Sequence, residues 1–180
     1  MSLMNLFGRR RHERAGFALY TAAVAAARDP WAFEALDVPD TLDGRFDMVG
    51  MQVFLVVHRL HTEGKAGKDL AQAVFDAMFA DMDTNLRELG VGDMTVAKKV
   101  KAMWEAFHGR STAYAAAIDS GDTAGLASAL ERNVWRMEAP PGAPAELARA
   151  MLDQARILAA KPLTDFLAGR VMLHPVRRAA

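Results

Sequence analysis

The sequence contains no cysteine, which excludes disulfide bonds, thiolate metal sites and cysteine nucleophiles. It also lacks any excess of charge: 22 basic and 22 acidic side chains cancel, and nothing in this balance suggests a nucleic acid partner. No apolar run reaches the roughly 20 residues that cross a bilayer. The arginines near the start follow the apolar residues instead of preceding them, so no signal peptide is expected. We therefore expect a soluble, cytoplasmic protein.

A calcium loop is the first tempting site that the sequence excludes. Asp81, Asp83 and Asn85 have the spacing with which such loops begin. The sixth position needs glycine but is Leu86, and the twelfth needs a bidentate glutamate but is Gly92. We expect no calcium site here.

Other catalytic and metal-binding patterns are also incomplete. His58 and His61 are three residues apart, but no Glu-x-x-His partner completes a di-metal set, which favours a packing or surface role. The glycine turn at residues 90–93 lacks the lysine and the serine or threonine of a phosphate-binding loop. There is no Gly-x-Ser-x-Gly nucleophile elbow, and Ser111 has no evident base. The sequence predicts no catalytic residue, no metal and no cofactor.

The strongest pattern is a pair of apolar stripes with helical spacing in residues 69–107. Gly90 suits the left-handed position after a helix, and Asp93 suits the cap of the next one. A turn this short predicts two antiparallel helices, and we expect this hairpin to be the core of the protein. The stripes comprise Leu70, Val74, Phe75, Met78, Phe79, Met82, Leu86 and Leu89, followed by Val96, Val100, Met103, Trp104 and Phe107.

The rest of the chain is also typical of helices. Residues 45–62 are apolar over more than half of the helical circumference, which predicts a central helix buried on several sides. Gly109 to Ser111 predict a break with Ser111 as the next cap, and residues 139–144 form a proline-rich linker before C-terminal helices. No segment alternates with period two. The predicted fold is all-α, with a single domain over residues 15–180 and about eight helices.

The first fourteen residues predict a flexible basic arm. This stretch carries Arg9, Arg10, Arg11 and Arg14 behind a short apolar start. One interpretation is an ordinary frayed terminus. The other is a contact with an anionic membrane surface, in which each arginine contributes on the order of 1 kcal/mol.

Five strings between about residues 20 and 135 resemble one known family. They are VPDTLDGRFD at 38–47, FDAMFADMD at 75–83, NLRELGVGD at 85–93, Gly109-Arg110 and Arg132-Asn133. In this order they resemble the ubiquinol–cytochrome c chaperone family.

The resemblance implies a non-enzymatic assembly factor for the cytochrome bc1 complex. Mitochondrial members of the family bind newly made cytochrome b together with a small companion protein. Because the chain is short and has no long transit sequence, we expect a bacterial member that acts at the cytoplasmic face of the inner membrane. Two alternatives remain: an adaptor that binds a soluble protein through the same groove, and an enzyme or small-ligand binder that uses the acidic helix face.

The family strings converge on the loop before residue 47, the helix face at 76–87 and the turn at 89–93. Arg45 is expected to pair with Asp81 or Asp83. These residues either bind the client or form a polar clasp that holds the fold. Five methionines belong either to the core or to an adaptable groove: Met48, Met51, Met78, Met82 and Met103. The predicted client-binding residues are Asp40, Arg45, Phe46, Asp47, Asp76, Phe79, Asp81, Met82, Asp83, Arg87 and Asp93.

Overall fold

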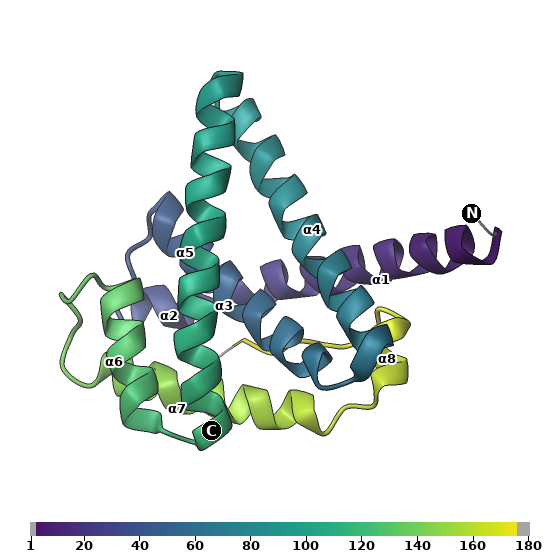
Figure 1. Cartoon of the computed structure of the whole chain (residues 1–180). Helices are drawn as coiled ribbons and strands as arrows, with labels where there is room; N and C mark the ends of the chain where they lie inside the picture. The colour runs from purple at the N-terminus through teal and green to yellow at the C-terminus, as the bar shows by residue number, and fades with distance from the viewer. Residues whose placement is uncertain (1–2, 176–180) are drawn as a thin grey trace.

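The computed structural model describes residues 3–175, and over this range every regular element is a helix, as the periodicity predicts (Figure 1). The eight helices of the described range are α1 Leu3–Ala27, α2 Pro30–Glu34, α3 Leu42–His61, α4 Gly64–Glu88, α5 Asp93–Ser120, α6 Thr123–Val134, α7 Ala143–Ala159 and α8 Leu163–Leu167. The prediction of a single all-α domain is confirmed.

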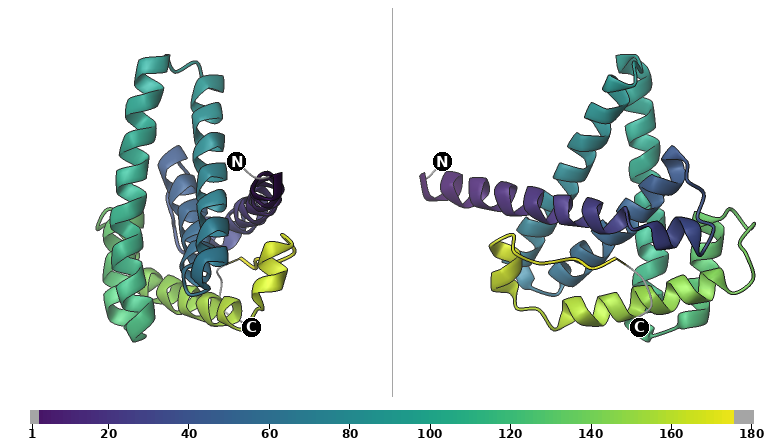
Figure 2. Two further views of the ribbon diagram at one scale, coloured as in Figure 1. Left: turned by 45° about the vertical axis from the view of Figure 1, so that its right-hand side comes forward. Right: turned by 180° about the vertical axis from the view of Figure 1, so that it is seen from behind.

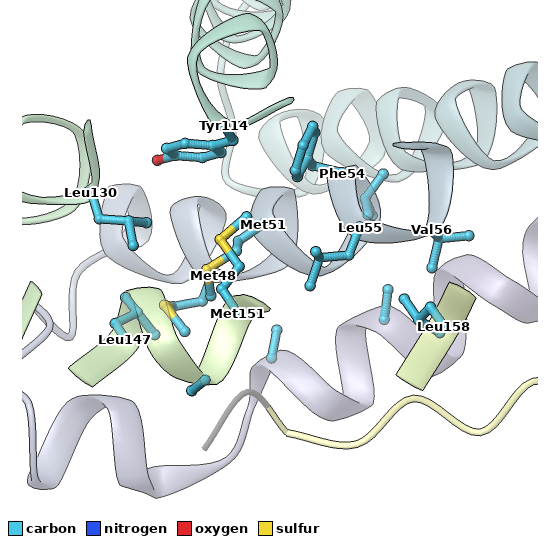
Figure 3. Packing of buried hydrophobic residues seen from close by; sticks show 14 of the residues in the cluster. Met48, Met51, Phe54, Leu55, Val56, Tyr114, Leu130, Leu147, Met151 and Leu158 are labelled. Carbon is cyan, nitrogen blue, oxygen red and sulfur yellow. The ribbon is translucent and has the colours of Figure 1, made fainter. Parts of the chain in front are cut away.

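Helix α3 lies at the centre of the domain, as its apolar circumference predicts. Thr41 caps its N-terminus, accepting a hydrogen bond from the Gly44 N–H at 3.1 Å. Helices α1, α4 and α7 pack around α3. In Figure 3, Met48 and Met51 of α3 gather with Leu147 and Met151 of α7, and all four side chains are buried. The apolar side chains of α3 are thus removed from water on several sides.

The predicted helical hairpin exists, but it is not the core. Gly90 has φ +78° and ends α4 as predicted, whereas the N-cap of α5 is Gly92 and not Asp93. The two helices meet at this turn and diverge away from it (Figures 1 and 2). Trp104, predicted to face α4, is 44% exposed. Helix α4 packs more extensively on α1 and α3 than on α5 because its small and apolar side chains face those helices.

The predicted break at residues 109–111 is also wrong. Helix α5 runs without interruption through Gly109 and Ser111. Phe107 and Tyr114 are both buried and fasten the helix to the core on either side of Gly109. This tertiary packing outweighs the roughly 1 kcal/mol that a glycine costs inside a helix.

The N-terminal segment is helical where the sequence predicts a flexible arm. Helix α1 begins at Leu3, so the backbone has no boundary near residue 14, and its first turns extend away from the domain (Figure 2). Arg10, Arg11 and Arg14 are exposed, while the side chain of Arg9 lies outside the described part. None of the described helices is long and apolar enough to cross a bilayer.

The crossing of α1 and α4 depends on one glycine. A Cβ atom on Gly16 would lie 2.7 Å from the backbone carbon of Ala73 and 2.8 Å from its Cβ. Gly16→Ala is expected to lower the free energy of unfolding by about 1–3 kcal/mol, because the backbones of the two helices must move apart. Gly109→Ala is the matched control. Its Cβ meets no atom within 4 Å, so we expect a gain of about 0.5–1 kcal/mol. Urea unfolding of both variants tests this, and equal effects would contradict the close crossing.

Candidate functional site

An open cleft of about 1000 Å³ lies beneath the α4–α5 turn, against α1, α2 and the start of α3. Its lining residues are Tyr20, Val24, Ala27, Arg28, Pro30, Phe33, Glu34, Asp40, Leu42, Asp43, Arg45, Phe46, Val49, Asp81, Met82, Asn85, Leu86, Glu88, Leu89, Lys99, Ala102 and Met103.

The cleft is apolar because two helical stripes extend beyond the core. Met82 on α4 and Met103 on α5 belong to the stripes that predict mutual packing, but here they line the cleft and remain partly accessible. Val49 of α3 lines the cleft and is likewise partly accessible. At the two edges, Leu42 is 59% exposed and Leu89 is 65% exposed. Exposed apolar side chains gathered around one hollow are typical of a binding surface.

Polar groups are placed at defined points of this cleft. The Tyr20 hydroxyl donates a hydrogen bond to Asp81 Oδ2 at 2.6 Å, which joins α1 to α4. Arg45 Nε and Nη2 donate to the two oxygens of Asp40 at 2.6 and 3.1 Å. The hydrogen bond from Arg45 lowers the pKa of the Asp40 carboxyl. The expected pairing of Arg45 with Asp81 or Asp83 is therefore wrong. Asp40 lies in the loop before α3, only five residues from Arg45, and its carboxylate accepts the hydrogen bonds instead.

Of the residues predicted from the family strings, five line the cleft: Asp40, Arg45, Phe46, Asp81 and Met82. Asp76 is exposed on α4 and accepts a hydrogen bond from Gln72 at 2.7 Å. Phe79 packs on Phe75 with 4.6 Å between ring centroids, in an aromatic contact that continues to Phe107 of α5. These two side chains lie outside the cleft lining.

Asp47 has a structural position. Its side chain is 3% exposed and accepts hydrogen bonds from Arg110 of α5 and from Arg136 Nη1, the latter at 3.0 Å. Burial raises the pKa of the Asp47 carboxyl, and the two guanidinium groups oppose that rise. The alternative of a buried polar clasp thus describes Asp47, but its partners are these two arginines.

Asp83, Arg87 and Asp93 form an exposed ion-pair group across the α4–α5 turn. Arg87 Nε donates to Asp83 Oδ2 at 2.5 Å, and its Nη1 donates to Asp93. The group connects the last turn of α4 to the first residue of α5. It lies beside the cleft, where it supports the turn that carries Leu89.

Several lining residues were not predicted as site residues. Tyr20 and Val24 come from α1, Phe33 from α2 and Val49 from an apolar stripe that indicates only burial. Met103 comes from another stripe, for which the sequence leaves core and groove open. A helical stripe does not reveal whether a partner helix covers it. Only the Met-rich composition gave a signal, because methionine suits both cores and adaptable grooves.

Tyr20 and Tyr114, the only tyrosines of the chain, are both buried and predict an unusual alkaline titration. Burial raises the pKa of Tyr114 to about 12, and burial with the hydrogen bond to Asp81 raises that of Tyr20 further. Because both native pKa values exceed the ordinary 10.0, the stability from the neutral phenols is complete below pH 10 and falls as the pH rises above it. We expect no phenolate absorbance step near pH 10 before unfolding. Tyr20→Phe should halve the phenolate signal, whereas a native step at the ordinary pKa would contradict the burial.

Fold and site define a class of protein: a small helical domain whose main feature is an apolar cleft with charged edges. Its geometry suits the binding of a protein segment, and over the described residues no cluster of three or more metal-ligating side chains occurs. The pattern of the ubiquinol–cytochrome c chaperone family matches residues 34–173. The chain belongs to this family.

Named relatives agree with this assignment. Ubiquinol-cytochrome-c reductase complex assembly factor 1 from Xenopus laevis is 29% identical over 120 residues, which cover 67% of this chain and 60% of the relative. The Mus musculus protein of the same name is 27% identical over 124 residues, 69% of this chain and 42% of the relative. The matched part thus spans 60% or less of either relative.

A solved structure supports the fold over nearly the whole length. The crystal structure of the Cbp3 homolog from Brucella abortus is similar with a TM-score of 0.83 and 36% sequence identity. The match covers 97% of this chain and 98% of the other. The helical arrangement described above is therefore shared with an experimentally determined structure.

Proposed function

We propose that this protein is a non-enzymatic assembly chaperone of the cytochrome bc1 complex and that its cleft holds an apolar segment of newly made cytochrome b. The observation that carries the proposal is the large apolar cleft at the α4–α5 turn. Support for the complex comes from the relatives, which are named as assembly factors of ubiquinol–cytochrome c reductase.

The cleft has the properties that a chaperone of a membrane subunit needs. An unassembled membrane protein exposes apolar surface that must be covered until its partners bind. The thioethers of Met82 and Met103 adapt to differently shaped apolar side chains. Leu42 and Leu89 extend the contact to both edges, and the charged side chains around them keep the empty cleft hydrated.

The predicted residues then divide by role. Asp40, Arg45, Phe46, Asp81 and Met82 contact the client, since they line the cleft. Asp83, Arg87 and Asp93 act through the turn, and Asp47 acts through the orientation of α5. Asp76 and Phe79 lie on α4 outside the lining. In this proposal they contact another component of the assembly, such as a small companion protein.

Peripheral contact with the cytoplasmic face of the membrane is a further part of the proposal. The exposed Arg10, Arg11 and Arg14 lie on the segment of α1 that extends away from the domain. Their charge suits an anionic lipid surface. This position leaves the cleft accessible to a client that emerges beside the membrane.

Co-purification in mild detergent from cells that make the protein tests the client. The expected result is recovery of cytochrome b in excess over the other subunits of the mature complex. Recovery of soluble proteins alone would overturn the proposal and favour an adaptor that uses the same cleft. Recovery of all bc1 subunits in equal amounts would also contradict it, because a chaperone binds the unassembled subunit.

A further inference from the structure

We infer that the cleft selects one kind of segment: about two turns of apolar helix with lysine or arginine at the end. This inference rests on the proposed function, because it describes what part of a client the same cleft takes. It is carried by the volume of the cleft and by the charges at its edges.

The volume sets the length of the segment. An α-helix with side chains is about 10 Å wide and rises 1.5 Å per residue, so each residue occupies roughly 120 Å³. A cleft of about 1000 Å³ therefore accommodates about eight residues. This is less than half of a membrane span, which needs about 20 residues. The cleft thus covers only part of a span along its length.

The charged residues of the lining indicate which part of a span is held. Arg45 is occupied by its two hydrogen bonds to Asp40. The remaining charged residues of the lining are four acids and two bases, although the whole chain has zero net charge. They are Glu34, Asp43, Asp81 and Glu88 against Arg28 and Lys99.

The acids occupy both sides of the opening. The exposed Glu34 and Asp43 lie on the side formed by α2 and α3, and the exposed Glu88 lies on α4, where the part-buried Asp81 accepts the hydrogen bond of Tyr20. Cationic groups at the end of a bound helix would meet carboxylates on either side, whereas an acidic end would be repelled. Apolar lining with an acidic opening is complementary to an apolar helix with a basic end.

In membrane proteins, apolar helices with basic ends occur on the cytoplasmic side of the membrane. Cytoplasmic ends of membrane spans are enriched in lysine and arginine, and the apolar span begins directly behind them. The cleft therefore fits the junction between a basic flank and the first two turns of a span. A chaperone at the cytoplasmic face meets this junction before the client is assembled.

Three labelled peptides test the selectivity with the purified full-length protein. They share one apolar helical core of about eight residues and end in two lysines, two glutamines or two glutamates. Fluorescence anisotropy at low salt is expected to show binding about tenfold tighter for the lysine peptide than for the glutamate peptide, with the glutamine peptide between them. Added salt should reduce this difference, because the charges at the opening are exposed. Equal affinities, the opposite order or no binding of any peptide would overturn the inference.

Charge reversal gives a second readout. Glu34→Lys with Asp43→Lys should abolish or invert the order of the three peptides. Glu138→Lys with Asp153→Lys makes the same change of charge at exposed positions outside the lining and should preserve the order. A lysine preference that survives the first pair of substitutions would overturn the role of the opening.

The two proposals fail separately. If the peptides are discriminated but cytochrome b does not co-purify, the selectivity stands and the client is wrong. If cytochrome b co-purifies but the peptides bind equally, the assembly role stands and the selectivity is overturned.

Discussion

Asp47→Ala is expected to lower the free energy of unfolding by about 3 kcal/mol, since removal of one partner of a buried ion pair leaves the other charge uncompensated. Asp47 is 3% exposed and Arg110 19% exposed, so Arg110 keeps little access to water once the carboxylate is gone. For a chain of this size the midpoint of thermal unfolding should fall by about 6–12 °C. Asp47→Asn retains an oxygen that accepts a hydrogen bond, and a smaller loss is expected.

Asp83→Ala is the control for this prediction. It also removes an aspartate that binds arginine, but the Asp83 and Arg87 side chains are 39% and 49% exposed. Exposed pairs contribute little because water and salt screen them. Thermal unfolding followed by circular dichroism should show almost no change for Asp83→Ala. Similar losses for the two aspartates would show that burial does not distinguish them.

Leu42→Asn combined with Leu89→Asn is expected to reduce the recovery of cytochrome b at least about tenfold, equivalent to about 1.4 kcal/mol of binding free energy. Both leucines are more than half exposed in the free protein, so their replacement costs little stability. In the complex they would cover the client from opposite sides of the cleft. Polar groups at these positions remain hydrated only if the client stays away.

Met94→Asn combined with Met172→Asn is the matched control. These methionines are 80% and 72% exposed and lie outside the lining of the cleft. Co-purification with each pair of substitutions, at equal amounts of folded protein, separates the cleft from general surface hydrophobicity. An equal loss with both pairs, or none with the leucine pair, would contradict the cleft as the client site.

The central helix and the hairpin turn show which features of the fold can be predicted from the sequence. The apolar circumference of residues 45–62 predicts a buried helix, and α3 is that helix. Gly90 predicts the turn, because only glycine adopts its φ of +78° without strain. Both features depend on local chemistry. The break predicted at Gly109 is wrong because Phe107 and Tyr114 are fastened to other helices, and their contacts are not local.

The candidate site shows the same division. The family strings indicate the region, and Asp81 and Met82 do line the cleft. They do not reveal that the Asp47 carboxylate binds Arg110, or that Arg45 binds Asp40. Which of several carboxylates an arginine meets depends on the three-dimensional positions of those carboxylates, which a one-dimensional pattern does not contain.

The sequence by itself determined the all-helical class, the absence of cysteine chemistry and the family, since each follows from residue types and their spacing along the chain. The tertiary structure alone decided that the stripes of Met82 and Met103 line an open cleft and not the core. The physical reason is that a helical stripe records only which side chains avoid water. Whether a neighbouring helix or a client covers them depends on how α4 and α5 diverge, and this is set by the packing of α4 on α1 and α3.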